Sequence, residues 1–280
     1  MKFLSNAHTH TTYCDGKSTL AEMVAAAQKL GFVSLGLSGH ADQNFDFPYC
    51  MGGGRQEKYL EEARRVQTEL AERGEAPRLW VGLEQDAFVP EECKARNRVQ
   101  TDYLIASTHY LPGRLGDQWV AVDGDPELLK RCVQERYGGD AVEMARAYFD
   151  THAAYVLAEN AAIIGHFDLV RKYAPLIGLD TSCAAYQKAA LDALERVRGG
   201  VLEINTGAIA RGTATTAYPD RFLLDAWREM DGRITLTSDC HDARYLDCAF
   251  DETLALLRSA GFERVLRLGA GDALWEEETL

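Results

Sequence analysis

The chain has 280 residues, of which 46% are hydrophobic, and its 30 basic and 43 acidic side chains give a formal net charge of −13. This length and hydrophobic content allow one large domain with a buried core. No basic block offsets the negative charge, so nucleic acid and anionic membranes make poor partners. The sequence shows no signal peptide and no apolar run long enough for a membrane span, and its seven cysteines contain no C-x-x-C pair. We therefore expect a soluble, cytoplasmic protein with reduced thiols.

Short apolar runs alternate with helical patterns along the whole chain, which is typical of parallel strands joined by helices. The predicted strands lie at residues 3–7, 33–38, 79–84, 103–107, 161–165, 201–205 and 234–238. Several of these runs lack a polar face, as strands buried on both sides do. The sequence therefore predicts an α/β fold built on a parallel sheet.

Helical patterns fill the intervals between the predicted strands. In the first interval, STLAEMVAAAQKLG, Thr19 and Glu22 can form a capping box and Gly31 is placed to end the helix. The other helices are expected at about 55–73, 126–136, 140–160, 182–198, 219–230 and 251–260. We expect a single domain over residues 1–280 with a helical insertion at about 110–160 over one end of a barrel, because this is the longest stretch between two predicted strands.

Histidines and carboxylates gather where the predicted strands end, and in barrels of parallel strands the active site is built at these carboxyl ends. The residues concerned are His8, His10, Asp15, His40, Glu84, His109, His166, Asp239 and His241. Imidazole and carboxylate ligands together suit zinc, iron or manganese, and nine ligands are too many for one ion. The sequence therefore predicts a site for two to three divalent metal ions, with Glu84 able to bridge through its two oxygens.

Some residues near the predicted site leave alternatives open. His152 lies in the middle of a predicted helix and is interpreted as a structural residue outside the site. Asp86 competes with Glu84 as the carboxylate at the end of the third strand, and Asp15 could simply form a turn. The sixth strand, which ends at Asn205, offers no obvious metal ligand.

Seven motifs resemble the polymerase and histidinol phosphatase (PHP) superfamily, in that family's order and over residues 8–241. They are HTHTTYCDG at 8–16, SGH at 38–40, GLEQD at 82–86, ASTHYL at 106–111, GHFDLVRK at 165–172, EINT at 203–206 and SDCH at 238–241. Three stretches are particularly similar to the stand-alone histidinol-phosphate phosphatases: HYL with WVAVDG downstream, GHFDLVRKY, and EINTGAIARG followed by YPD.

This resemblance implies a distorted (β/α)7 TIM-like barrel with a trinuclear metal site. His8, His10, Glu84 and Asp239 would hold one ion, Glu84 would bridge to a second ion bound by His109 and His166, and Asp15, His40 and His241 would hold the third. The resemblance also implies that Arg171 and Arg211 contact phosphate, and a guanidinium can fork onto two phosphate oxygens. One departure lies at 41–54, where the Gly-rich ADQNFDFPYCMGGG could reshape access for the substrate.

The function expected from these features is hydrolysis of L-histidinol phosphate, a step of histidine biosynthesis, by a metal-activated hydroxide that attacks phosphorus. Glu84, Asp239 and His241 are the expected catalytic residues, and the expected partner is a small phosphorylated metabolite. The first alternative is a phosphoesterase of the same superfamily that acts on a nucleotide or another small phosphate ester. A non-catalytic module and a metal-storing or metal-sensing protein are two further alternatives. No pattern in the sequence indicates an oligomeric state.

Overall fold

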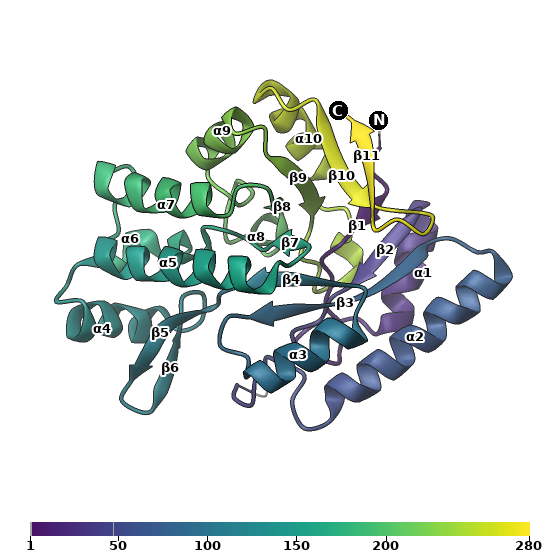
Figure 1. Ribbon diagram of the computed structural model, residues 1–280, viewed down its shortest axis with the longest axis horizontal. Coiled ribbons are helices and arrows are strands. Elements are labelled where there is room, and N and C mark those ends of the chain that lie inside the picture. Colours follow the sequence, from purple (N-terminus) through teal and green to yellow (C-terminus); the bar gives the residue numbers. More distant parts are fainter. Residues whose placement is uncertain (1, 47) are drawn as a thin grey trace.

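The computed structural model describes residues 2–46 and 48–280, and the centre of this part of the chain is a curled sheet of nine strands (Figure 1). The sheet order is β1 (Ser5–Asn6), β2 (Ser34–Leu37), β3 (Arg78–Asp86), β4 (Tyr103–Ser107), β7 (Ile163–Ile164), β8 (Val201–Asn205), β9 (Arg233–Thr237), β10 (Arg264–Leu268) and β11 (Trp275–Thr279). Every neighbouring pair is parallel except β10 with β11. All seven predicted strands are present, β1 and β7 as pairs of residues only, and the predicted distorted barrel of α/β class is confirmed.

The sheet curls until the chain that follows β1 meets the chain that follows β9. Thr9 forms an isolated parallel bridge with Cys240. The His10 amide donates to the Cys240 carbonyl at 2.8 Å, and the Cys240 amide donates to the His8 carbonyl at 3.0 Å. These bonds bring together the polar segments at the carboxyl ends of the first and last predicted strands.

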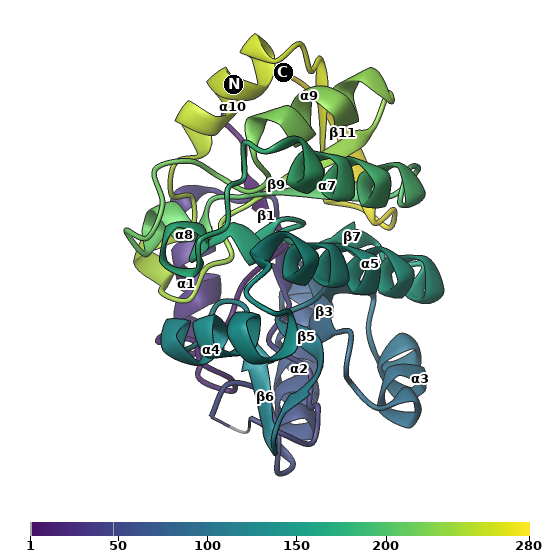
Figure 2. The same cartoon turned by 90° about the vertical axis from the view of Figure 1, so that its left-hand side faces the viewer.

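Helices cover the outside of the curled sheet (Figures 1 and 2). The longer ones are α1 (Leu20–Leu30), α2 (Arg55–Arg73), α3 (Glu91–Gln100), α4 (Pro126–Arg136), α5 (Ala141–Glu159), α7 (Ala184–Arg196), α9 (Arg221–Glu229) and α10 (Phe250–Ser259), and α6 (Ala174–Ile177) and α8 (Gly207–Ala210) are single turns. The predicted capping box is present, because the Glu22 amide donates to Thr19 Oγ1 at 3.2 Å and the Thr19 amide donates to Glu22 Oε2 at 2.7 Å. Gly31 ends α1 with a φ of 76°, a conformation that glycine adopts without strain.

The stretch between β4 and β7 contains a hairpin as well as two helices. Strands β5 (Tyr110–Leu115) and β6 (Gln118–Ala121) pair antiparallel and project from the barrel with α4 beside them (Figure 1). Helix α5 runs alongside α7 and contacts β4, so it occupies the place of an ordinary barrel helix (Figures 1 and 2). The hairpin was not predicted, since Pro112 and Gly113 interrupt the alternation of apolar residues that identifies a strand.

Helix α3 and strands β10 and β11 were also not predicted, because α3 and β11 carry little hydrophobic signal and arginines break the short apolar run RVLRL of β10. Helix α3 reads EECKARNRVQ and begins after Pro90, and only Cys93 and Asn97 are buried. Strand β11 reads WEEET and pairs antiparallel with β10, and its acidic side chains face arginines of β10, for example Glu278 Oε1 at 2.5 Å from Arg267 Nε. None of the helices within 2–46 and 48–280 has the length and apolar character needed to cross a membrane.

Candidate metal centre

The structure places all nine predicted metal ligands at the carboxyl rim of the sheet. Their donor atoms fall into three groups, each with its atoms within 4.8 Å of one another: His10, Asp15, His40 and His241; His8, His10 and Asp239; and His40, Glu84 and His109. His166 joins the last group, because its Nε2 lies 2.8 Å from Glu84 Oε1. Residues more than 230 positions apart in the sequence therefore share one site.

Glu84 stands between two sets of histidines. Its Oε1 lies 2.8 Å from His166 Nε2 and 3.4 Å from His109 Nε2. Its Oε2 lies 3.2 Å from His8 Nε2 and 3.4 Å from His10 Nε2. The residue is only 2% exposed, and each of its two oxygens faces histidines of the cluster.

Asp239, which follows β9, faces His8 and His10, which follow β1. Its Oδ1 lies 3.2 Å from His10 Nε2 and 3.7 Å from His8 Nε2. Its backbone φ is 44°, in the left-handed region, where aspartate is tolerated better than most residues. This conformation holds the carboxylate over the rim, where Arg211 Nη2 donates to Asp239 Oδ2 at 3.0 Å.

Asp15 links His241 and His40 on the outer side of the cluster. Its Oδ2 lies 3.2 Å from His241 Nε2, and its Oδ1 lies 3.6 Å from His40 Nε2. The ring of His10 stacks on that of His241 with centroids 4.1 Å apart. Asp15 therefore belongs to the site and does not merely form a turn.

The electrostatics of the rim favour the metal-binding protonation states of Glu84 and His10. Burial opposes ionisation of Glu84, but the nearby His8, His40 and His109 outweigh it and hold the pKa of Glu84 well below its ordinary value. Burial, followed by the charges of His241 and His40, lowers the pKa of His10 to about 3. At neutral pH the carboxylate is thus ionised and His10 is neutral, as metal ligands must be.

Two ligand atoms at the centre of the cluster, His8 Nε2 and His10 Nε2, are buried yet make no hydrogen bond within the described residues. Buried polar atoms of this kind are costly unless they are paired. Both nitrogens lie within 3.4 Å of Glu84 Oε2, which is also 2.8 Å from His40 Nδ1, and nitrogen and oxygen donors are the types that divalent transition metals accept. The donor set therefore fits metal ions.

Glu203, in the middle of β8, is a site residue that sequence reasoning missed. Its Oε1 lies 2.5 Å from His8 Nδ1, and its Oε2 accepts the His166 amide at 2.6 Å. Thr237 Oγ1 and Asn205 Nδ2 donate to the same carboxylate, which is fully buried. A carboxylate behind a histidine ligand fixes the tautomer that leaves the other ring nitrogen free for metal. The only signal in the sequence was a charged residue inside the apolar run VLEIN.

Asp86 positions His109 and is not a competitor of Glu84. Its Oδ2 accepts the His109 amide at 2.7 Å and lies 3.3 Å from His109 Nδ1. His109 Nε2 consequently faces Glu84. Burial opposes protonation of His109, but the nearby charges of Glu84 and Asp86 have a larger effect and raise the pKa of His109 to about 9.

His152 lies outside the cluster, as predicted. It is fully buried in α5, where its Nδ1 is 3.0 Å from Thr108 Oγ1. Burial, with smaller effects from His166 and His109, lowers its pKa to about 3. His152 is therefore a neutral residue of the core at physiological pH.

A cavity of about 290 Å³ opens onto the ligand cluster, and Arg211 and Lys172 line it beside Asp15, Glu84 and His241. Arg211 extends from the end of α8, and its guanidinium is 3.3 Å from His241 Nδ1. Its side chain is 39% exposed, so the guanidinium remains accessible from the cavity.

Arg171 is held differently from Arg211. Its Nε donates to Asp168 Oδ2 at 2.7 Å, its Nη2 donates to the Ala217 carbonyl at 3.1 Å, and its guanidinium lies over the Tyr218 ring. Arg171 is not among the described residues that line the cavity, whereas its neighbour Lys172 is.

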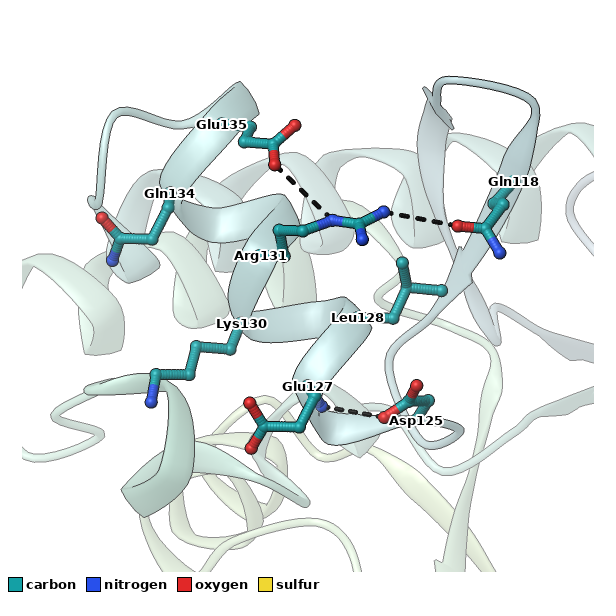
Figure 3. A pocket seen from close by; sticks show the side chains of 8 residues that line it. All are labelled: Gln118, Asp125, Glu127, Leu128, Lys130, Arg131, Gln134 and Glu135. Carbon is teal, nitrogen blue, oxygen red and sulfur yellow. Dashed lines mark hydrogen bonds and ion pairs between the residues drawn. The ribbon is translucent and has the colours of Figure 1, made fainter.

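A second hollow lies on the outer surface of α4 and contains none of the predicted ligands. Figure 3 shows Arg131 between Glu135 and Gln118, with the Asp125 side chain accepting from the Glu127 amide at the start of the helix. These residues form hydrogen bonds and an ion pair with one another at an exposed surface, and they do not form a recognisable reaction site.

The fold and the rim define a metal-binding α/β barrel protein, and comparison with known proteins identifies the family. The model of the family described as PHP domain matches residues 6–207, which is more than half of the chain. The chain therefore belongs to the PHP domain family.

Individual relatives agree with this membership. A Schizosaccharomyces pombe protein named "Probable histidinol-phosphatase" is 24% identical over 225 residues, which cover 77% of this chain and 69% of the relative. Two solved structures have the same fold. One is a candidate histidinol phosphatase from Listeria monocytogenes, with a TM-score of 0.74, 20% identity, and coverage of 89% of this chain and 99% of the other. The other is a Lactococcus lactis histidinol phosphate phosphatase complexed with zinc, L-histidinol and phosphate, with a TM-score of 0.68, 22% identity, and coverage of 95% and 97%.

Proposed function

We propose that this protein is a metal-dependent phosphomonoesterase that hydrolyses L-histidinol phosphate to L-histidinol and phosphate. The observation that carries the proposal is the position of Glu84, whose two oxygens face two sets of histidines at the floor of a cavity lined by Arg211. The S. pombe relative's name and the L-histidinol and phosphate bound to the L. lactis protein support this choice of substrate.

The same proposal assigns the metal ligands. His8, His10, Glu84 and Asp239 would hold one ion, Glu84 with His109 and His166 a second, and Asp15, His40 and His241 a third. Two to three ions of zinc, iron or manganese would be bound, and the zinc in the L. lactis structure favours zinc. Divalent ions in such a site supply an activated water and offset the charge of phosphate oxygens.

The chain's own groups prepare the site for a phosphate ester. Arg211 lies beside Asp239 and His241 and would fork onto two phosphate oxygens, with Lys172 adding a second positive charge. Glu84, Asp239 and His241 are the proposed catalytic residues, because they line the same cavity as Arg211. Arg171 stays a predicted phosphate contact, and its bonds to Asp168 and Ala217 support a role in holding the loop that carries Lys172.

The setting of the reaction is part of the proposal. We assign it to histidine biosynthesis in the cytoplasm. All seven cysteines are free thiols, which is the state that a reducing compartment maintains.

A substrate panel tests the proposed function. Phosphate release would be measured from histidinol phosphate, nucleoside monophosphates and glycerol phosphate with metal-loaded protein. We expect histidinol phosphate to give the highest kcat/KM. Faster release from nucleotides would favour the alternative phosphoesterase, and a metal-loaded protein inert toward every ester would favour a non-catalytic module.

A further inference from the structure

The cavity over the metal centre has a second acidic region, separate from the ligand cluster. Five carboxylates line the cavity, and three of them, Asp15, Glu84 and Asp239, belong to the proposed metal centre. The other two are Asp46 and Asp123. They are not among the proposed metal ligands, and they lie in the same cavity as the cations Arg211 and Lys172, the second of which forms an ion pair with Asp123.

Asp46 is held by contacts between two segments that are distant in sequence. It lies in the Gly-rich stretch 41–54, and its Oδ2 accepts the Tyr110 hydroxyl at 2.6 Å. Next to it, Phe45 stacks on Trp119 of the hairpin with ring centroids 4.5 Å apart. The loop that carries Phe45 and Asp46 and the β5–β6 hairpin thus form one wall of the cavity.

Asp123 follows β6 on the same wall, and its main chain is fixed from the other side of the cavity. Its carbonyl accepts Lys172 Nζ at 2.8 Å and the Tyr173 hydroxyl at 3.1 Å. The carboxylate oxygen Oδ2 lies 3.6 Å from Lys172 Nζ, which is beyond hydrogen-bond length. The carboxylate therefore keeps hydrogen-bonding capacity for another donor.

Tyr49 provides an independent sign of a ligand at this wall. Tyr49 lines the cavity, and its buried hydroxyl has no hydrogen-bond partner among residues 2–46 and 48–280. A buried hydroxyl without a partner is costly unless a ligand or water completes it. Its ring lies against that of His40, a proposed metal ligand, with centroids 3.9 Å apart.

We propose that Asp46, Asp123 and Tyr49 form a subsite for the protonated amine of the substrate, so that the protein selects phosphate monoesters of amino alcohols. This inference rests on the proposed function and names the feature of the substrate that is recognised. An ammonium donates hydrogen bonds to carboxylates and to a phenol oxygen, while the phosphate lies toward Arg211. A nucleotide brings no such cation to the acidic wall and is disfavoured there.

The test compares histidinol phosphate with its N-acetyl derivative, which lacks the ammonium. We expect the wild type to prefer the amine by at least about tenfold in kcat/KM, since a charged hydrogen bond is worth that much. Asp123→Asn and Asp46→Asn should each reduce the preference to about threefold or less. Asp117→Asn is the matched control, because Asp117 is exposed on the same hairpin and does not line the cavity.

Two results would overturn the subsite: a wild type that hydrolyses both forms equally well, or Asp123→Asn and Asp46→Asn variants that keep the full preference with normal metal content. If neither form of histidinol phosphate is hydrolysed, the proposed function fails, and 2-aminoethyl phosphate is then compared with propyl phosphate. A preference for the aminoethyl ester supports the subsite, and equal rates contradict it.

Discussion

Replacing Glu203 with Gln should weaken metal binding although Glu203 is not itself a proposed ligand. The two oxygens of Glu203 meet donors on both sides: His8 and Thr237 at Oε1, and the His166 amide and Asn205 at Oε2. A Gln amide nitrogen at the Oε2 position would face the His166 amide and Asn205 Nδ2, which are both hydrogen-bond donors, so this orientation is unfavourable. The amide nitrogen would therefore face His8 Nδ1 and Thr237, whose hydroxyl can rotate to accept.

In that orientation His8 Nδ1 must accept the hydrogen bond, so the ring proton moves to Nε2 and blocks the nitrogen that faces Glu84 and Asp239. Loss of such a supporting carboxylate costs roughly 10- to 100-fold in metal affinity, or about 1.4 to 2.7 kcal/mol. The assay is titration of zinc or manganese into chelator-treated protein. Glu159→Gln is the control, because Glu159 is also a buried, hydrogen-bonded carboxylate but contacts Gln85 and Arg98 instead of the rim. A folded Glu203→Gln protein with wild-type metal affinity would refute the reasoning.

Three further predictions follow from the site and the core. Glu84→Gln should remove at least one ion per chain and lower phosphate release by about a hundredfold or more, since one substitution damages two ligand sets; an unchanged metal count by mass spectrometry would disprove the bridge. Arg211→Gln should raise KM and the inhibition constant of inorganic phosphate by about tenfold, whereas Arg131→Gln, on the outer surface of α4, should change neither. His152 is neutral when folded, with a pKa of about 3, and titrates near 6.5 when unfolded, so the stability it contributes is lost as pH falls from about 6.5 toward 3. Between pH 7 and 5, the free energy of unfolding of the metal-free His152→Asn protein should fall by about 2 kcal/mol less than that of the metal-free wild type. The same fall in both proteins would contradict this assignment.

The sequence predicted seven of the eight parallel strands and the ligand cluster because both leave a regular trace. Strands buried on two faces appear as apolar runs, and the residues just after them must meet at one rim. His8 and Asp239 are far apart in the chain, yet their positions after strands were enough to expect them in one site.

Other features could not be predicted because they depend on tertiary pairing. Glu203 lies inside a strand, and its role becomes visible only when β8 brings it behind His8. Strand β11 carries acidic residues that pair with arginines of β10, so no hydrophobic alternation identifies it. Arg171 and Arg211 both follow strand ends, but only Arg211 lines the cavity, and no sequence pattern distinguishes the two.

The most direct test is a steady-state assay of phosphate release from histidinol phosphate by protein whose bound metal has been measured. We expect no release after chelation, and release that rises with bound metal until two or three ions per chain are present. Protein that carries this full complement and releases no phosphate from histidinol phosphate would contradict the proposed activity.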